Sequence, residues 1–166
     1  MIQLQPFTNK DFDTLISWVG NEEELLQFSG PDFKFPLTRE QLAVNISEQN
    51  RHPYAIVDAS SGKMIAYAEI YVTRENTGIL GRILIGDPEM RGHGIGVQIV
   101  QELLFISYTI LGVKNTSLYV FDWNIGAIKC YEKAGFVINL DKTANLVFKG
   151  QTLKLLTMEY DRKNES

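Results

Sequence analysis

The chain has 166 residues, 45% of them hydrophobic and 22% charged, which is typical of a single globular domain, and we expect one over residues 1–166. A formal net charge of −4 argues against a nucleic-acid partner, and the one cysteine, Cys130, excludes an internal disulfide. No apolar run approaches the roughly 18 residues of a membrane span and the start does not resemble a signal peptide, so we expect a cytoplasmic protein without a membrane partner.

The N-terminal part predicts a strand followed by helices. Ile2 and Leu4 alternate with polar residues, which is typical of a strand. Three capping signals then predict helix starts: Thr8 or Asn9 with an end at Gly20, Asn21 with Glu24, and Thr38 with Gln41. The segment Phe28–Leu37 contains glycine and two prolines and is predicted to be a loop.

The rest of the sequence alternates strands with two helices. Strands are predicted at residues 54–59, 64–72, 79–85, 117–121, 136–140 and 153–160. Helices are predicted at residues 95–111 and 124–134, the second ending at Gly135. A mid-chain hairpin followed by a strand–helix–strand crossover predicts an α/β (α+β) sandwich with a mixed sheet.

A glycine loop, Arg91-Gly92-His93-Gly94-Ile95-Gly96, lies between a predicted strand and the long helix. Unpaired N–H groups converge there at the positive end of the helix dipole, and glycines let a phosphate approach the backbone. The Rossmann pattern fails because Ile99 stands where the third glycine is needed, and no Lys-Ser/Thr follows as in a P-loop. The loop predicts a pyrophosphate site, with a ligand-free glycine turn as the alternative.

Two motifs resemble those of GNAT acetyltransferases. Arg91-x-x-Gly94-x-Gly96 matches the family's phosphate-binding signature, and residues 124–136 match its Asn-x-x-Ala-x-x-x-Tyr-x-x-x-Gly-Phe block. The specific resemblance covers roughly residues 64–136, and the chain is broadly similar to the branch that includes ribosomal-protein N-terminal and spermidine acetyltransferases. It implies a mixed, mostly antiparallel central sheet with helices on both faces.

The resemblance also implies acetyl-CoA as co-substrate and no metal. In the family, the strand before the loop binds pantetheine through its main chain, the loop binds the pyrophosphate, and the second motif contacts the cofactor. Carried onto this sequence, the cofactor-binding residues are Leu84, Ile85, Gly86, Arg91, Gly92, His93, Gly94, Ile95, Gly96, Val97, Asn124, Tyr131 and Lys133. Gly86 departs from the aliphatic residue that is usual there, but a main-chain contact should survive the change.

Catalysis needs a proton donor for the departing thiolate and an acceptor for the proton of the amine. Tyr131 stands where the family places the donor. Glu69, on the strand beside the cofactor strand, is our candidate base, with an ion-paired strand glutamate as the alternative; Asp122 is a second candidate. Cys130 has no apparent His or acid partner, so we expect direct transfer rather than an acetyl-cysteine intermediate.

We therefore expect an N-acetyltransferase that moves an acetyl group from acetyl-CoA to a primary amine within a ternary complex. The acceptor is left open between a small-molecule amine and a protein N-terminus, and so is assembly into a homodimer. Two other classes of protein compete with this interpretation: a non-catalytic acyl-CoA-binding or regulatory module of the same fold, and an unrelated nucleotide-binding protein.

Overall fold

The structure is a computed structural model and describes residues 1–162. Within these residues the strands form one seven-stranded sheet in the order β1-β2-β3-β4-β5-β7-β6. The strands are β1 (Ile2–Pro6), β2 (Arg51–Asp58), β3 (Met64–Val72), β4 (Thr77–Ile85), β5 (Asn115–Phe121), β6 (Phe136–Phe148) and β7 (Gln151–Tyr160). Neighbours are antiparallel except β4 and β5, which run parallel because the crossover between them carries a helix.

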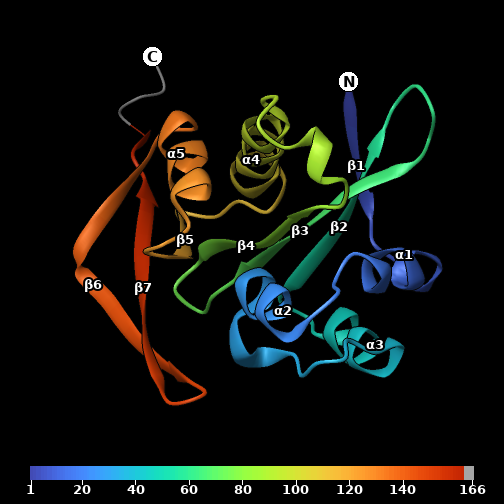
Figure 1. The fold of residues 1–166 in the computed structure, drawn as a ribbon. Coiled ribbons are helices and arrows are strands. Elements are labelled where there is room, and N and C mark those ends of the chain that lie inside the picture. The colour runs from blue at the N-terminus through green and yellow to red at the C-terminus, as the bar shows by residue number, and fades with distance from the viewer. Residues whose placement is uncertain (163–166) are drawn as a thin grey trace.

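Helices cover both faces of the sheet. The helices are α1 (Phe12–Ser17), α2 (Glu22–Ser29), α3 (Arg39–Ser47), α4 (Ile95–Phe105) and α5 (Ile125–Lys133). Figure 1 shows α4 and α5 on one side of the sheet and α1, α2 and α3 on the other. This confirms the predicted mixed, mostly antiparallel sheet with helices on both faces. No helix among residues 1–162 is both long and apolar enough to cross a membrane.

The buried apolar side chains of the described residues form a cluster on each face of the sheet. Successive strand residues point to opposite faces, so β3 contributes Ala68 and Ile70 to the cluster under α4 and α5, and Tyr67 to the cluster under α1–α3. All three side chains are fully buried. The central strands therefore separate two cores, which explains why their sequences are apolar almost throughout.

The cap signals are confirmed in part. The Asn21 side chain accepts a hydrogen bond from Glu24 N at 2.8 Å, and Thr38 Oγ1 accepts one from Gln41 N at 3.3 Å. A full capping box at Thr38 would also have the Gln41 side chain accept a hydrogen bond from the N–H of Thr38. That bond is not formed, because the side-chain amide of Gln41 bonds the main chain of Lys34 and Pro36 instead. Gln41 thus fastens the loop before α3.

Several predicted boundaries were wrong. The strand predicted at residues 136–140 continues to Phe148, because a register shift between Asn139 and Ala144 interrupts the alternation without ending the pairing with β7. The predicted helix 95–111 is α-helical to Phe105 and then widens to a π-helix over Ile106–Ile110. The first helix begins as a 3₁₀ turn at Asn9–Asp11, and α2 extends into the predicted loop as far as Ser29.

Candidate active site

The parallel strands β4 and β5 pair only over part of their length. Their register runs from Thr77 opposite Asn115 to Leu80 opposite Leu118. Beyond Leu80, β5 continues to pair with β7 and β4 with β3, so within the described residues the facing edges of β4 and β5 are left unpaired. Unpaired main-chain groups at the carboxyl end of parallel strands can bind an extended ligand as though it were another strand.

A β-bulge lies in the ladder with β3, in the part of β4 whose edge toward β5 is open. Tyr67 pairs with Leu84 and Glu69 with Gly81, so two β4 residues oppose the single β3 residue between them. One of the two, Arg82, has a φ of +50°, in the left-handed region. Bulges are frequent beside active sites, because they bend a strand and change the direction of a side chain.

The predicted cofactor-strand residues occupy the end of β4. Leu84 pairs with Tyr67 in β3, and the N–H of Gly86 donates to the carbonyl of Ile65 at 2.9 Å. A Cβ on Gly86 would lie 2.1 Å from Cε2 of Trp18, so the indole occupies the space that a side chain would need. This contact gives the physical reason for glycine where an aliphatic residue was expected.

The glycine loop leads directly into α4. Gly92 and Gly94 have φ values of +79° and +85°, which explains the need for glycine at both positions. Gly94 is the N-cap of α4 and offers no side chain to the first-turn N–H groups, which lie exposed or half-buried at the helix start. Such a terminus can bind a phosphate through its main chain.

Arg91 connects this loop to the open edge. Its guanidinium donates a 3.0 Å hydrogen bond to the carbonyl of Ile85, the last residue of β4. Arginine has five N–H donors, so this bond leaves others for an anion. His93 is exposed on the same loop. The structure therefore brings the end of β4, Arg91 and the start of α4 together.

The helix that carries Tyr131 packs beside the glycine loop. Asn124 caps α5 by accepting a hydrogen bond from Ala127 N at 3.3 Å. The two helices approach so closely that a Cβ on Gly96, in the first turn of α4, would lie 3.0 Å from Cys130 Sγ. Lys133 is exposed in the last turn of α5, farther along the helix from the Asn124 cap.

Tyr131 and Cys130 both lie where burial raises the pKa of the side chain. Tyr131 packs against the core, with its ring edge-to-face with Phe136 at 6.4 Å. Burial raises the pKa of Tyr131 well above its ordinary value, with a further contribution from Cys130, so the phenol holds its proton at neutral pH. Burial also raises the pKa of the Cys130 thiol, against the opposing charge of Lys133, which disfavours the nucleophilic thiolate.

Glu69, the candidate base, is 1% exposed and lies at the centre of an ion-pair cluster. Its carboxylate pairs with Arg51 at 2.8 Å and Arg82 at 3.2 Å. Asn45 donates to it at 2.8 Å, and the hydroxyl of Tyr67 also donates to it. These are the surroundings of the ion-paired glutamate that the sequence left open as the alternative, and the base role stays a prediction.

The second candidate base, Asp122, is exposed just after β5, where its N–H donates to the carbonyl of Lys154 at 3.1 Å. The neighbouring Trp123 stacks on Phe121 with ring centroids 4.3 Å apart. Among residues 1–162 no group of three or more His, Cys, Asp or Glu side chains is arranged to hold a metal ion.

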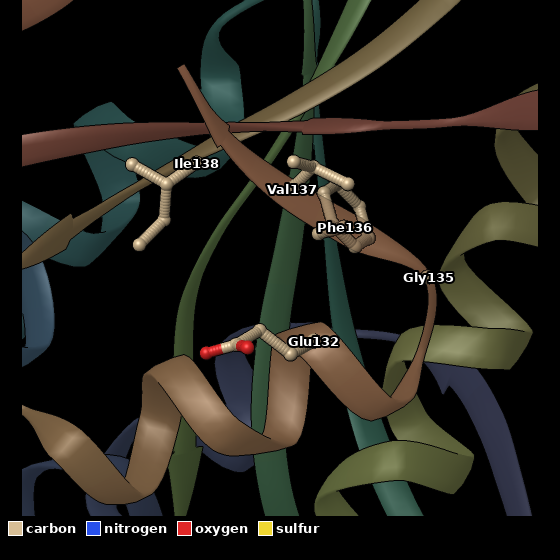
Figure 2. Close-up of a pocket in the computed structure, with 5 residues that line it drawn as sticks. All are labelled: Glu132, Gly135, Phe136, Val137 and Ile138. Carbon is tan, nitrogen blue, oxygen red and sulfur yellow. The ribbon is translucent and has the colours of Figure 1, made fainter. Parts of the chain in front are cut away.

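A separate hollow of about 300 Å³ lies between α5 and β6, lined by Glu132, Gly135, Phe136, Val137 and Ile138 (Figure 2). Figure 2 shows that its walls are the last turn of α5 and the first residues of β6. These residues follow Tyr131 in sequence and include none of the glycine loop. The hollow is therefore distinct from the site at the end of β4.

Sequence reasoning missed the partners of Glu69. Arg82 is the one charged residue in the apolar stretch Ile79–Ile85, and its side chain is 9% exposed. A charge inside an otherwise apolar strand must find partners when it is buried, so this signal was present in the sequence. The sequence held no such signal for the hydrogen bond from Asn45 to Glu69, because that bond depends on how α3 packs on the sheet.

Comparisons with known proteins agree with this geometry. The sequence matches the acetyltransferase (GNAT) family over residues 22–136. The spermidine N-acetyltransferase of Vibrio cholerae, solved with CoA and spermine, is similar in structure with a TM-score of 0.78 and 20% identity, over 95% of this chain and 94% of that one. An aminoglycoside acetyltransferase solved with coenzyme A has a TM-score of 0.75 and 20% identity, over 100% of this chain and 99% of that one. At these identities the likeness is one of fold.

Proposed function

The chain belongs to the acetyltransferase (GNAT) family, and on that premise we propose that it transfers an acetyl group from acetyl-CoA to a primary amine. The observation that carries the proposal is the open edge of β4 ending at the glycine N-terminus of α4, where Arg91 bonds Ile85. An extended pantetheine can pair with the open edge while the pyrophosphate binds the first turn of the helix.

The fold neighbours support both halves of this assignment. One was solved with CoA and spermine, and an aminoglycoside acetyltransferase was solved with acetyl-CoA and an aminoglycoside. Acceptors in both cases are amines, which fits an acidic protein with a net charge of −4. We propose a small-molecule amine or a protein N-terminus as the acceptor here.

We propose that transfer is direct. The neutral amine attacks the thioester carbonyl, the C–S bond breaks, and Tyr131 gives its proton to the departing thiolate. The phenol is protonated at neutral pH and so has a proton to give, while the burial that raises its pKa makes it a weaker acid than a free tyrosine. The raised pKa of Cys130 supports a route without an acetyl-cysteine. In this scheme the ammonium first loses a proton to Glu69 through water, or to solvent, before attack. The second proton, which the nitrogen releases once the N–C bond has formed, restores the Tyr131 phenol.

A screen of amines with acetyl-CoA, read by thiol release and by product mass, tests the function. Acetylation of at least one amine, together with loss of acetyl-CoA binding when the glycine loop is altered, is the expected result. Binding of acetyl-CoA without thiol release for any amine would instead favour the non-catalytic module. Tight ATP or NAD binding without CoA binding would favour an unrelated nucleotide-binding protein.

A further inference from the structure

Arg82 connects parts of the molecule that are distant in sequence. Its guanidinium bonds Asn45 Oδ1 in α3 at 2.6 Å and pairs with Glu69 in β3 at 3.2 Å. It also pairs with Asp32 at 3.0 Å and lies 4.5 Å from the ring centroid of Phe33, both in the segment that follows α2. One buried side chain therefore touches the sheet, a helix and a loop.

The main chain of Arg82 belongs to the proposed cofactor site. The residue lies in the bulge of the open-edged part of β4, two positions before Leu84, with its φ of +50°. A left-handed conformation at a residue other than glycine is strained and persists only where surrounding contacts hold it. The pairing of β4 with β3 on both sides of the bulge keeps the main chain in place, and the guanidinium connects this part of the strand to the loop.

The segment Gly30–Phe33 meets Arg82 through two side chains. Asp32 is 68% exposed, and its carboxylate pairs with the buried guanidinium of Arg82. Phe33 is half-buried and lies against the same guanidinium. Because α2 packs against β4, this segment lies on the α1–α3 side of the sheet, close to the cofactor strand.

We propose that Arg82 is a positioning residue that holds the segment Gly30–Phe33 against the open edge of β4, and so sets where the acceptor amine meets the thioester. This proposal rests on the proposed function. Arg82 acts through the loop and the strand rather than on the reacting atoms. Displacement of a positioning element by about 1 Å can lower a rate roughly 100-fold, so the attachment matters for acceptor use.

Two other arginines provide controls. Arg51 also pairs with Glu69, at 2.8 Å, but its further partners are Glu48 and the Tyr71 ring, not the loop. Arg39 makes the same kinds of contact elsewhere: an ion pair with Asp13 at 2.7 Å and a guanidinium 5.2 Å from the Phe12 ring centroid. Arg51 therefore tests the cluster without the loop, and Arg39 tests an ion pair plus ring contact away from β4.

The main variant is Arg82→Gly, because glycine accepts a φ of +50° and only the side chain is lost. We expect acetyl-CoA affinity to stay within about twofold while KM for an accepted amine rises roughly tenfold or more. Amide hydrogen exchange in residues 30–35 should become faster. Arg39→Ala should leave amine KM unchanged, and Arg51→Ala should lower Tm without faster exchange in residues 30–35.

A second variant, Asp32→Ala, removes an exposed side chain and should fold normally. It should raise amine KM and loop exchange in the same direction as Arg82→Gly, and the double variant should add less than the sum of the two. Lower Tm in Arg82→Gly with unchanged amine KM and loop exchange would overturn the proposal, as would unchanged KM and exchange in Asp32→Ala. If the unaltered protein acetylates no amine, the proposed function fails, and the exchange data still decide whether Arg82 holds the loop.

Discussion

Replacement of Gly94 separates backbone strain from electrostatic repulsion at the proposed pyrophosphate site. Gly94 has a φ of +85° and open space where a Cβ would be placed, so Gly94→Ala costs only the strain of a left-handed residue. That strain is roughly 1–2 kcal/mol, which lowers Tm by roughly 2–8 °C in a chain of this size. Gly94→Glu has the same strain and adds a negative charge.

The added charge should dominate cofactor binding. A carboxylate about 6 Å from one phosphate charge is repelled by about 3 kcal/mol at an effective dielectric constant of about 20. This corresponds to a loss of roughly 100-fold in affinity, since about 1.4 kcal/mol is tenfold. Gly94→Ala should lose far less affinity, because its main-chain N–H groups remain. The difference in acetyl-CoA affinity between Gly94→Ala and Gly94→Glu should become smaller at high salt, because salt screens the repulsion.

Calorimetry with acetyl-CoA measures the two affinities, and thermal unfolding confirms that both variants are folded. A truncated donor, S-acetylpantetheine, lacks the pyrophosphate and provides the matched comparison. Gly94→Ala and Gly94→Glu should use it equally well. Equal acetyl-CoA affinity in the two folded variants would refute the placement of the pyrophosphate at this helix start. So would a deficit of Gly94→Glu relative to Gly94→Ala that is as large with the truncated donor as with acetyl-CoA.

Four further predictions concern Tyr131, the contact between α4 and α5, and Glu69. Tyr131→Phe should lower kcat by roughly 10²–10⁴-fold at unchanged acetyl-CoA affinity, and by less with a donor whose thiol is more acidic, whereas a packing role predicts normal kcat. Because burial raises the pKa of Tyr131 above its ordinary value of 10.0, its contribution to stability is full below that pH and is lost as pH rises further. Burial raises the pKa of Tyr54 and Tyr67 too, so urea unfolding at alkaline pH should show a smaller loss of stability in Tyr131→Phe than in the unaltered protein, not a complete absence of it. Gly96→Ala places a Cβ 3.0 Å from Cys130 Sγ and should lower Tm, whereas Cys130→Ala should retain activity. Because Cys130→Ala removes the sulfur, the added Cβ should lower Tm less in the double variant than in Gly96→Ala alone, and strictly additive Tm changes would contradict this contact. Glu69→Gln should lower the free energy of unfolding by about 3–5 kcal/mol if the carboxylate serves the ion pairs. A stable variant whose kcat is strongly reduced, and whose pH–rate profile has lost its acidic limb, would instead favour the base role.

Much of the fold could be predicted from short-range patterns. The Asn21 cap is a contact between residues three positions apart, and the left-handed turns at Gly92 and Gly94 need glycine whatever surrounds them. Period-2 and period-3.6 apolar patterns located most strands and helices for the same reason. The pattern failed in β6, where the bulge after Asn139 breaks the alternation while the ladder with β7 continues.

The sequence alone determined the glycine loop, the order of its motifs and their place between strands and helices, because each depends on residues a few positions apart. Only the tertiary structure decided that β4 and β5 separate after Leu80, that Trp18 occupies the space beside Gly86, and that Glu69 is surrounded by arginines. These features join residues that are tens of positions apart. Their energies depend on how strands, loops and helices pack together, and no local pattern in the sequence records that packing.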